Sequence, residues 1–316
     1  MARTTKLSLI GLVFLLALFP LFQPPIHSLS FLFLVFLYII LAESWNLIGG
    51  FGGYLSFGHV AFFGIGTYTS ALLFQKLGLS PFVGAFPAGM MAAAVAAVIG
   101  YPCLRLRGPY FAVVTLCFAF IMDLIVKNWS FLGGSEGIHL KLVEMEIRLS
   151  RSIFYEIYLG LGAVTVIFVR WVEHSKMGLG LSAIREDEEV AQTLCIPTAR
   201  LKLQAFVLSA FFPGVAGGLY AYYISYVHPD VVFDISVSIL IVLMALFGGG
   251  TSWPGPLVGA ALLSIINELL STYIKPEIAR MIYGALFVAV ILFMPDGIVA
   301  FLKRKRKQGS LSPSIS

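Results

Sequence analysis

The chain has 316 residues, of which 59% are hydrophobic and 12% are charged, with a formal net charge of +5. A soluble globular domain carries roughly twice that charged fraction and a smaller apolar share, so the composition excludes an ordinary soluble enzyme or binding domain. The mean hydropathy is +0.93. The sequence contains repeated apolar runs whose length is close to the roughly 20 residues that a helix needs to cross a bilayer. The composition therefore predicts an all-α polytopic membrane protein.

Apolar periodicity, interrupted by proline and glycine, predicts about ten transmembrane helices. In chain order the expected spans are 7–23, 29–48, 57–75, 81–102, 109–127, 154–172, 203–225, 232–248, 256–273 and 280–301. The first span follows Arg3 and Lys6, as the core of a signal peptide would. Prolines rather than a small-residue cleavage site come next, so we expect a retained helix.

The distribution of positive charge predicts the orientation. An even number of spans places both termini on one side, and that side holds fourteen of the 21 lysines and arginines. Because such residues accumulate in cytoplasmic loops, we expect both termini in the cytoplasm. We expect one transmembrane domain over residues 1–302 and a basic, disordered tail over 303–316, whose cluster Lys303–Lys307 faces anionic lipid.

Nothing in the sequence marks an enzyme or a metal site. The three cysteines, Cys103, Cys117 and Cys195, are widely spaced and form neither a disulfide framework nor a C-x-x-C motif. The chain has no H-E-x-x-H motif and no serine–histidine–aspartate spacing. It also has no G-x-x-x-x-G-K-[ST] phosphate loop. We therefore expect no bound cofactor and no ATPase site in this chain.

Two polar segments interrupt the spans. Residues 128–152 fall outside, and alternation from Leu140 to Leu149 predicts a short strand or hairpin there. Residues 173–202 fall inside and hold the longest charged stretch of the sequence. Since Ser182 is a capping residue and Pro197 ends a helix, we expect one helix from Ser182 to Cys195. Its residues fit equally a solvated loop helix and a docking helix for a cytosolic partner.

Glycines cluster at two places in apolar surroundings. Gly49 to Gly53 contains four glycines between the second and third spans, and Phe247-Gly-Gly-Gly250 precedes the ninth. A helix break at membrane depth is tolerated only where protein or a water-filled cavity covers the freed backbone groups. Paired interrupted segments are typical of transport sites. We therefore predict glycine-interrupted spans that border a path.

Ionisable residues inside the spans are the second sign of a path. They are Glu43, His59, Asp123, Asp234, Glu268 and Asp296. The three aspartates lie near predicted helix ends, where they reach water or cap a helix, so Glu43 and His59 are the stronger candidates. With neighbouring polar and glycine residues, the candidate translocation path comprises Glu43, Asn46, Gly52, Gly53, Ser56, His59, Gly249 and Gly250.

A resemblance to a known family is carried by three ordered pieces: LSFGHVAFFGIGTYTSALL (55–73), MGLGLSAIREDEEVAQTLCIPTARLKLQAFVLSAFFPGVAGGLYAYYISYVHPD (177–230) and LMALFGGGTSWPGPLVGAALL (243–263). They resemble the LivM-type permease of branched-chain amino acid ABC importers. The resemblance implies a bacterial inner-membrane subunit that imports leucine, isoleucine and valine together with a second homologous permease. It also implies two cytosolic ATPase subunits, which hydrolyse ATP, and a periplasmic substrate-binding protein.

The same resemblance implies that the inner helix is the coupling helix that docks on an ATPase subunit. Its residues are Ser182, Ile184, Arg185, Glu186, Asp187, Glu188, Glu189, Ala191, Leu194 and Cys195. We expect Ala191 and Leu194 to form its apolar knob. The sequence departs from the family at Cys195, where glycine is usual, and at Pro213, where a small residue is usual. Pro213 predicts a kink in the seventh span.

Other cargoes and other classes of membrane protein also fit the sequence. Within the family, urea, short amides or another small solute are possible cargoes. A stand-alone secondary transporter or channel with ion sites at Glu43, Asp234 and Glu268 is a different class, and it would work without an ATPase. A membrane enzyme with His59 as a base has no partner motif in the sequence.

Overall fold

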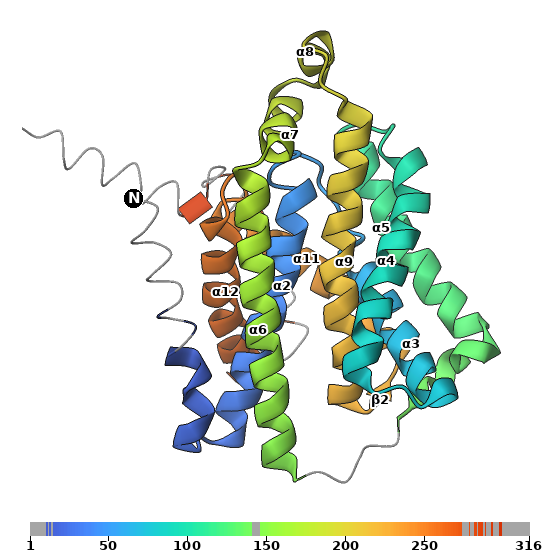
Figure 1. Cartoon of the computed structure of the whole chain (residues 1–316), viewed down its shortest axis with the longest axis vertical. Coiled ribbons are helices and arrows are strands. Elements are labelled where there is room, and N and C mark those ends of the chain that lie inside the picture. Colours follow the sequence, from blue (N-terminus) through green and yellow to red (C-terminus); the bar gives the residue numbers. More distant parts are fainter. Residues whose placement is uncertain are drawn as a thin grey trace, which may run out of the picture.

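The computed structural model describes residues 11, 13, 15–140 and 146–273, with scattered positions between 278 and 298. Figure 1 shows its long helices running beside one another, with α7 and α8 projecting beyond one end of the bundle. The helices are α2 (Ile26–Ile48), α3 (His59–Leu77), α4 (Pro81–Cys103), α5 (Pro109–Asn128), α6 (Ile147–Glu173), α7 (Lys176–Glu186), α8 (Glu188–Thr193), α9 (Thr198–Ile224), α10 (Pro229–Val232), α11 (Ile235–Gly248) and α12 (Pro254–Tyr273). The short elements are the 3-10 turns η1 (Phe19–Phe22), η2 (Ser130–Leu132) and η3 (Gly134–Glu136) and the strands β1 (Ile138–His139) and β2 (Tyr226–Val227).

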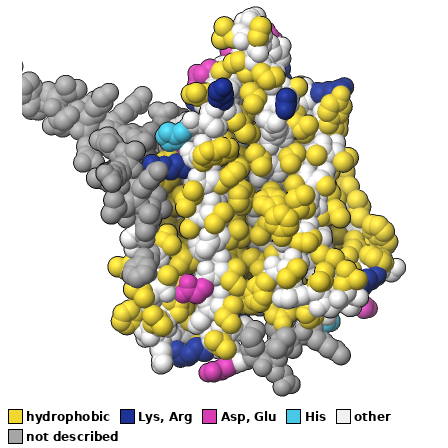
Figure 2. Space-filling model, in the orientation of Figure 1, with side chains coloured by type: hydrophobic (Ala, Val, Ile, Leu, Met, Phe, Trp, Pro, Cys, Tyr) yellow, Lys and Arg dark blue, Asp and Glu magenta, His cyan; other side chains and the backbone are white. Residues whose placement is uncertain are grey.

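The all-helical membrane class predicted from composition is confirmed. Within the described part, α2, α4, α5, α6, α9 and the α10–α11 pair are long and apolar enough to cross a membrane. The shorter or less apolar α3 and α12 pack among them. Figure 2 shows a broad hydrophobic band across the middle of the molecule, with charged side chains mostly towards its two ends.

Eight of the ten expected spans coincide with helices that the structure describes. Seven of them match a single helix, and the expected span 232–248 matches the α10–α11 pair. The first and last expected spans, 7–23 and 280–301, lie largely outside the described residues. The tail at 303–316 lies outside them entirely.

Alternate connections between the helices gather at opposite ends of the bundle. At one end, Arg185 on α7 donates to the carbonyl oxygen of Gly50 at 3.1 Å, and Arg107 contacts Glu189 at 2.9 Å. These contacts join the α2–α3, α4–α5 and α6–α9 connections, so we name this end the α8 end. At the other end, β1 pairs antiparallel with β2, with Ile138 opposite Val227. We name it the β end.

Close helix contacts in the centre depend on small residues. A methyl group at Gly214 of α9 would lie 2.5 Å from the Cβ of Ala92 on α4 and 3.0 Å from the Cα of Gly89. One at Gly217 would overlap the carbonyl oxygen of Phe63 on α3. In lipid, helices associate through such close packing rather than through removal of apolar surface from water. Pro213 lies inside α9, which continues through it from Thr198 to Ile224.

The outer loop differs from the prediction in two ways. The helix α6 begins at Ile147, inside the segment that we expected to be a loop up to residue 152. The strand lies at Ile138–His139 and pairs with Tyr226–Val227, so no hairpin forms over Leu140 to Leu149 among the residues that the structure covers. Residues 141–145 lie outside that description.

Candidate functional site

The connection between α2 and α3 passes back into the bundle without forming a helix. Gly49–Gly53, which we name the first glycine turn, reverse the chain after α2 ends at Ile48, and residues 54–58 form an irregular segment before α3. The indole N–H of Trp45, on α2, donates to the carbonyl oxygen of Ser56 at 2.7 Å. The irregular segment therefore lies alongside the last turn of α2.

Hydroxyl groups from distant helices satisfy the backbone of the irregular segment. The amide of Phe57 donates to the hydroxyl of Thr115 on α5 at 3.1 Å. The hydroxyl of Ser238 on α11 donates to the carbonyl oxygen of Phe57 at 2.7 Å and accepts from the amide of Val60 at 3.3 Å. These bonds replace the water that is missing at membrane depth, so the helix break is held by protein contacts.

The two glycine clusters predicted from composition meet in space. We name residues 249–253, between α11 and α12, the second glycine turn. A methyl group at Gly50 would overlap the carbonyl oxygen of Gly250 and the amide oxygen of Asn46. The backbones therefore touch at a position that only glycine fits. Gly52 is buried in the first turn, and Gly53 has a φ of +74° and packs against the Arg185 side chain.

Three candidate path residues are buried polar groups. Glu43 and Asn46 are fully buried and His59 is 1% exposed, and no side chain of the described residues forms a hydrogen bond with any of the three. Glu43 and Asn46 lie one helical turn apart on α2, and the Leu257 amide near the start of α12 faces Glu43. Buried polar groups without partners are rare in proteins and need an explanation, such as a water or a ligand.

The structure does not bring all the candidate residues together. His59 is the first residue of α3 and lies near Phe62, with ring centroids 6.0 Å apart. No hydrogen bond or ion pair of the described residues joins it to Glu43. Ser56 is buried, and its hydroxyl accepts from the amide of Gly58 at 3.3 Å, so it supports the irregular segment locally.

The inner segment forms two helices, and the prediction of one helix from Ser182 to Cys195 is wrong. The hydroxyl of Ser175 caps α7 by accepting from the Gly178 amide, so Ser182 lies inside that helix. Asp187 is extended, with a φ of −160°, and its carboxylate accepts from the first amides of α8 at 2.8 and 3.1 Å. Aspartate is a favoured N-cap, and here this preference ends one helix and starts the next. Cys195 follows α8 with a φ of +58°, a conformation that glycine adopts more readily.

A buried lysine joins α8 to the rest of the bundle. The ammonium of Lys202 on α9, which is 4% exposed, donates to Glu188 at 2.6 Å, to the hydroxyl of Tyr54 at 3.0 Å and to the carbonyl oxygen of Leu104 at 3.0 Å. Tyr54 in turn donates to Glu188 at 2.7 Å, and Arg107 lies 3.5 Å from the same carboxylate. We name these five residues the Lys202 network. All three lysine donors have partners, which offsets the desolvation of its charge.

The Lys202 network also sets the charge of Glu188. Burial alone raises the pKa of this carboxyl group, but hydrogen bonds from Lys202 and Tyr54, with the nearby charges of Lys202 and Arg107, bring it below the ordinary value. Glu188 therefore stays ionised at neutral pH, and the ion pair persists. The network connects α8 to the irregular segment, where Tyr54 lies, and to the end of α4.

The outer surface of α8 is apolar at two positions. Val190 is 53% exposed and Leu194 is 68% exposed, whereas Ala191 is buried. The expectation that Ala191 belongs to the exposed knob is therefore wrong, because its methyl group packs inward. Ile184 on α7 is buried as well. The apolar surface available to a partner is formed by Val190 and Leu194.

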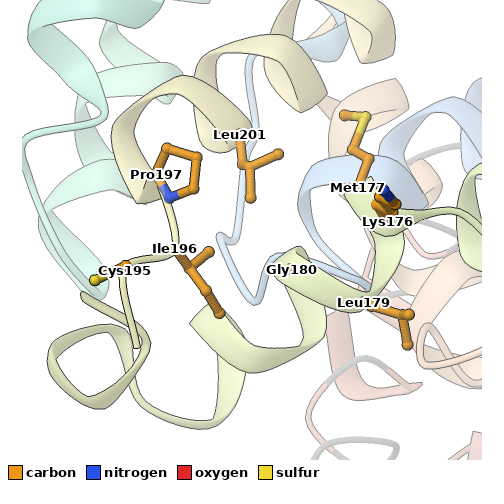
Figure 3. A pocket seen from close by; sticks show the side chains of 8 residues that line it. All are labelled: Lys176, Met177, Leu179, Gly180, Cys195, Ile196, Pro197 and Leu201. Carbon is orange, nitrogen blue, oxygen red and sulfur yellow. The ribbon is translucent and has the colours of Figure 1, made fainter. Parts of the chain in front are cut away.

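An apolar pocket of about 490 Å³ lies beside α8, between α7 and the start of α9. Its lining residues are Lys176, Met177, Leu179, Gly180, Cys195, Ile196, Pro197 and Leu201. Figure 3 shows Ile196 and Leu201 reaching towards α7, where Gly180 leaves room for them. The α8 end thus presents both a protruding apolar surface and a recess next to it.

Comparison with known proteins identifies the family. A family model described as "Branched-chain amino acid transport system / permease component" matches residues 28–291. The chain is 30% identical to the high-affinity branched-chain amino acid transport system permease protein LivM of Escherichia coli strain K12, over 96% of this chain and 76% of that protein. It is 27% identical to LivH of the same strain, over 83% of this chain and 91% of that protein. No solved structure matches the chain significantly.

These matches agree with the all-helical membrane architecture. Permeases of this family are transport subunits without catalytic activity, and their ATPase resides in partner subunits. In the described part of the chain, no three histidine, cysteine, aspartate or glutamate side chains come together to hold a metal ion. The family model covers most of the chain, and the chain therefore belongs to the permease components of branched-chain amino acid ABC transport systems.

Proposed function

We propose that this chain is the permease subunit of an ATP-driven importer for leucine, isoleucine and valine in a bacterial inner membrane. The names of its relatives support this cargo, since LivM and LivH are both described as high-affinity branched-chain amino acid permeases. Two such permeases in one strain support a path formed with a second homologous permease. Two cytosolic ATPase subunits and a periplasmic substrate-binding protein complete the importer.

The charge distribution supports an orientation with the α8 end and both termini in the cytoplasm. Fourteen of the 21 lysines and arginines belong to the side that carries the α7–α8 segment. Positive residues accumulate in cytoplasmic loops, so this end is the one that meets cytosolic subunits.

The position of α8 supports a role in coupling ATP hydrolysis to transport. It projects beyond the bundle, as Figure 1 shows, and its Glu188 is bound to buried Lys202 and to Tyr54. Arg185 of α7 also reaches the first glycine turn at Gly50. A displacement of α7 and α8 by an ATPase therefore acts on the segment between α2 and α3. This is a contact route between a docking surface and the candidate path.

Two measurements test the assembly and the cargo. A mild-detergent purification of the chain from its native membrane, with mass spectrometry of the co-purifying proteins, should recover a second permease and two ATPase subunits. Recovery of a monodisperse chain alone would favour a secondary transporter. Uptake of labelled leucine should be inhibited by isoleucine and valine, whereas inhibition by urea or short amides instead would assign the other cargo class.

Introducing charge on α8 is expected to release the ATPase. In the Val190→Asp/Leu194→Asp variant, two exposed apolar side chains become charged and no longer fit an apolar surface of a partner. Co-purification of the ATPase should fall at least tenfold, while the amount of folded chain in the membrane stays unchanged.

The matched control is Val231→Asp/Leu149→Asp, which charges two exposed apolar residues at the β end. It should leave ATPase binding intact. Full retention of the ATPase by the α8 variant would remove α8 as the docking element.

We also propose that the first and second glycine turns border the translocation path, with Glu43, Asn46, Ser56 and His59 beside it. The support is the burial of Glu43, Asn46 and His59 without a side-chain hydrogen bond among the described residues, together with the contact between the turns at Gly50 and Gly250. Gly52, Gly53 and Gly249 belong to the same turns. A path here would be controlled from α7 and α9, since Arg185 of α7 binds Gly50 and Lys202 of α9 binds Tyr54, both in the connection between α2 and α3.

Glu43→Gln is expected to lower the rate of leucine uptake about tenfold. The carboxylate can accept a charge-assisted hydrogen bond from an ammonium group, which is worth roughly 1.5–3 kcal/mol, and an amide of the same size cannot replace it. The measurement is initial uptake at equal membrane levels. Glu156→Gln, in α6, is the control and should keep the wild-type rate. An unchanged rate in Glu43→Gln would assign Glu43 a packing role.

A further inference from the structure

A second pocket lies at the α8 end, between the last turn of α4 and the first turns of α9. Its volume is about 360 Å³. Its lining residues are Gly100, Tyr101, Leu104, Arg105, Ala199, Arg200 and Leu203. The two helices emerge from the hydrophobic band here, since α4 ends at Cys103 and α9 begins at Thr198. The pocket therefore lies at the depth of lipid headgroups.

Two arginines of this pocket lack an acidic partner. Neither Arg105 nor Arg200 forms an ion pair with any described residue, and no acidic residue lines the pocket. Arg107, two residues further along, contacts both Glu188 and Glu189. The guanidinium of Arg105 lies over the ring of Tyr101, 4.9 Å from its centroid, which holds it at the pocket. Both guanidinium groups of the pocket can therefore bind an anion.

The remaining lining is apolar and continues onto the outer face of α4. Leu104, Ala199 and Leu203 contribute hydrocarbon to the pocket. On α4, Tyr101 is 64% exposed and Val98 is 75% exposed, one turn deeper in the bundle. An exposed apolar face at this depth contacts acyl chains. Guanidinium groups bind phosphate in a fork geometry, and tyrosine is enriched where lipid headgroups meet hydrocarbon.

We propose that this pocket binds an anionic phospholipid. Its phosphate would lie between Arg105 and Arg200, and an acyl chain would follow the face of α4 that carries Val98. The apolar lining selects an intact lipid over free phosphate, because a soluble anion gains nothing from Leu203 or Ala199. Basic pockets between transmembrane helices at a cytoplasmic surface have this ligand chemistry. Figure 2 shows basic side chains close to the boundary between the hydrophobic band and the α8 end.

The site also adjoins the Lys202 network. Leu104 lines the pocket, while its carbonyl oxygen accepts from Lys202. A lipid bound here restrains the end of α4 at the residue that anchors the buried lysine. The proposal concerns lipid binding and does not depend on the cargo, so it is tested by direct binding rather than by transport.

The test is native mass spectrometry of the full chain, purified with the subunits that accompany it and titrated with defined lipids. Wild-type protein should hold one phosphatidylglycerol molecule at concentrations where zwitterionic phosphatidylethanolamine does not bind. Each arginine near an anionic headgroup contributes roughly a fivefold change in affinity. Arg105→Gln/Arg200→Gln should therefore weaken phosphatidylglycerol binding about twentyfold or more.

Three further measurements complete the test. Arg148→Gln/Arg151→Gln removes the same charge at the β end and should leave the binding of phosphatidylglycerol unchanged. Leu203→Trp fills the pocket with both arginines in place and should by itself lower lipid occupancy at least fivefold. Glycerol 3-phosphate should not displace the lipid, and displacement at equal concentration would identify a soluble phosphate site instead. Equal retention of both lipids, or unchanged binding in Leu203→Trp and in the arginine double variant, would overturn the proposal.

Discussion

Lys202→Met is expected to reduce transport per ATP hydrolysed at least tenfold and to destabilise the chain by about 3 kcal/mol. Removing one partner of a buried ion pair leaves the other charge without compensation, and this is strongly destabilising. Glu188 would lose its contact at 2.6 Å, and Tyr54 and the Leu104 carbonyl would lose the donor that joins them. The measurement is uptake and ATP hydrolysis by the reconstituted importer, with thermal unfolding of the same preparation.

A double variant separates stability from coupling. Lys202→Met/Glu188→Met removes both charges, and replacing a whole buried pair by apolar residues is often neutral for stability. Its unfolding temperature should return towards the wild-type value while transport per ATP stays low, because the ion pair between α8 and α9 is lost. Lys176→Met, an exposed lysine on α7, should change neither quantity. Wild-type coupling in the stable double variant would limit the Lys202 network to a structural role.

Gly50→Val is expected to lower uptake at least tenfold at equal membrane levels. The added side chain would overlap the carbonyl oxygen of Gly250 and the side chain of Asn46. One obstacle is backbone, which cannot move aside as a flexible side chain can, so the two glycine turns must separate. Overpacking of this kind costs roughly 1–3 kcal/mol and displaces the surrounding structure. Gly50→Ala should give a smaller loss of the same kind, measured by initial leucine uptake.

Gly160→Val provides the matched control for this substitution. Gly160 lies in α6, and a methyl group there would meet nothing within 4 Å. The variant makes the same change of side chain without the steric conflict, so its uptake should remain close to the wild-type rate. Normal uptake in Gly50→Val would mean that the contact between the turns has no part in transport.

Long apolar runs were the most reliable part of the sequence prediction. A segment of about 20 apolar residues in lipid must satisfy its backbone internally, and a helix does this without help from any other element. Helix ends were less predictable. The helix α6 begins as early as Ile147, where Arg148 donates to the carbonyl oxygens of Gln23 and Pro24. These hydrogen bonds satisfy the charged side chain at the start of the helix. Hydropathy alone assigns that arginine to a loop.

The Lys202 network was missed for a related reason. Lys202 lies next to the apolar part of the seventh span, and in the sequence its charge indicates only the orientation of the chain. Its partners Tyr54 and Leu104 are 148 and 98 residues away in the sequence. The available signal is a lysine between Leu201 and Leu203, at the border of the predicted seventh span. Composition can flag such a residue but cannot name its partners.

The glycine turns illustrate what pattern and structure each contribute. Two glycine clusters in corresponding places predicted breaks in the helices, and the structure confirms the break before His59. The contact of Gly50 with Gly250 depends on how α2, α11 and α12 pack, which no local pattern encodes. The division of the inner segment into α7 and α8 at Asp187 was also unpredicted. An aspartate can either continue a helix or cap the start of a new one, and the local sequence does not decide between the two.

The irregular segment before α3 has a consequence for how the chain is built into the membrane during synthesis. The Phe57 amide is satisfied by Thr115, 58 residues later, and the Val60 amide by Ser238, 178 residues later. Until those helices have left the ribosome, the groups they satisfy have no protein partner, and each costs several kcal/mol in hydrocarbon. We therefore expect α3 to make its final contacts only after α11 has been inserted. A chain truncated before residue 238 should then be cleaved faster by membrane proteases than the full-length chain.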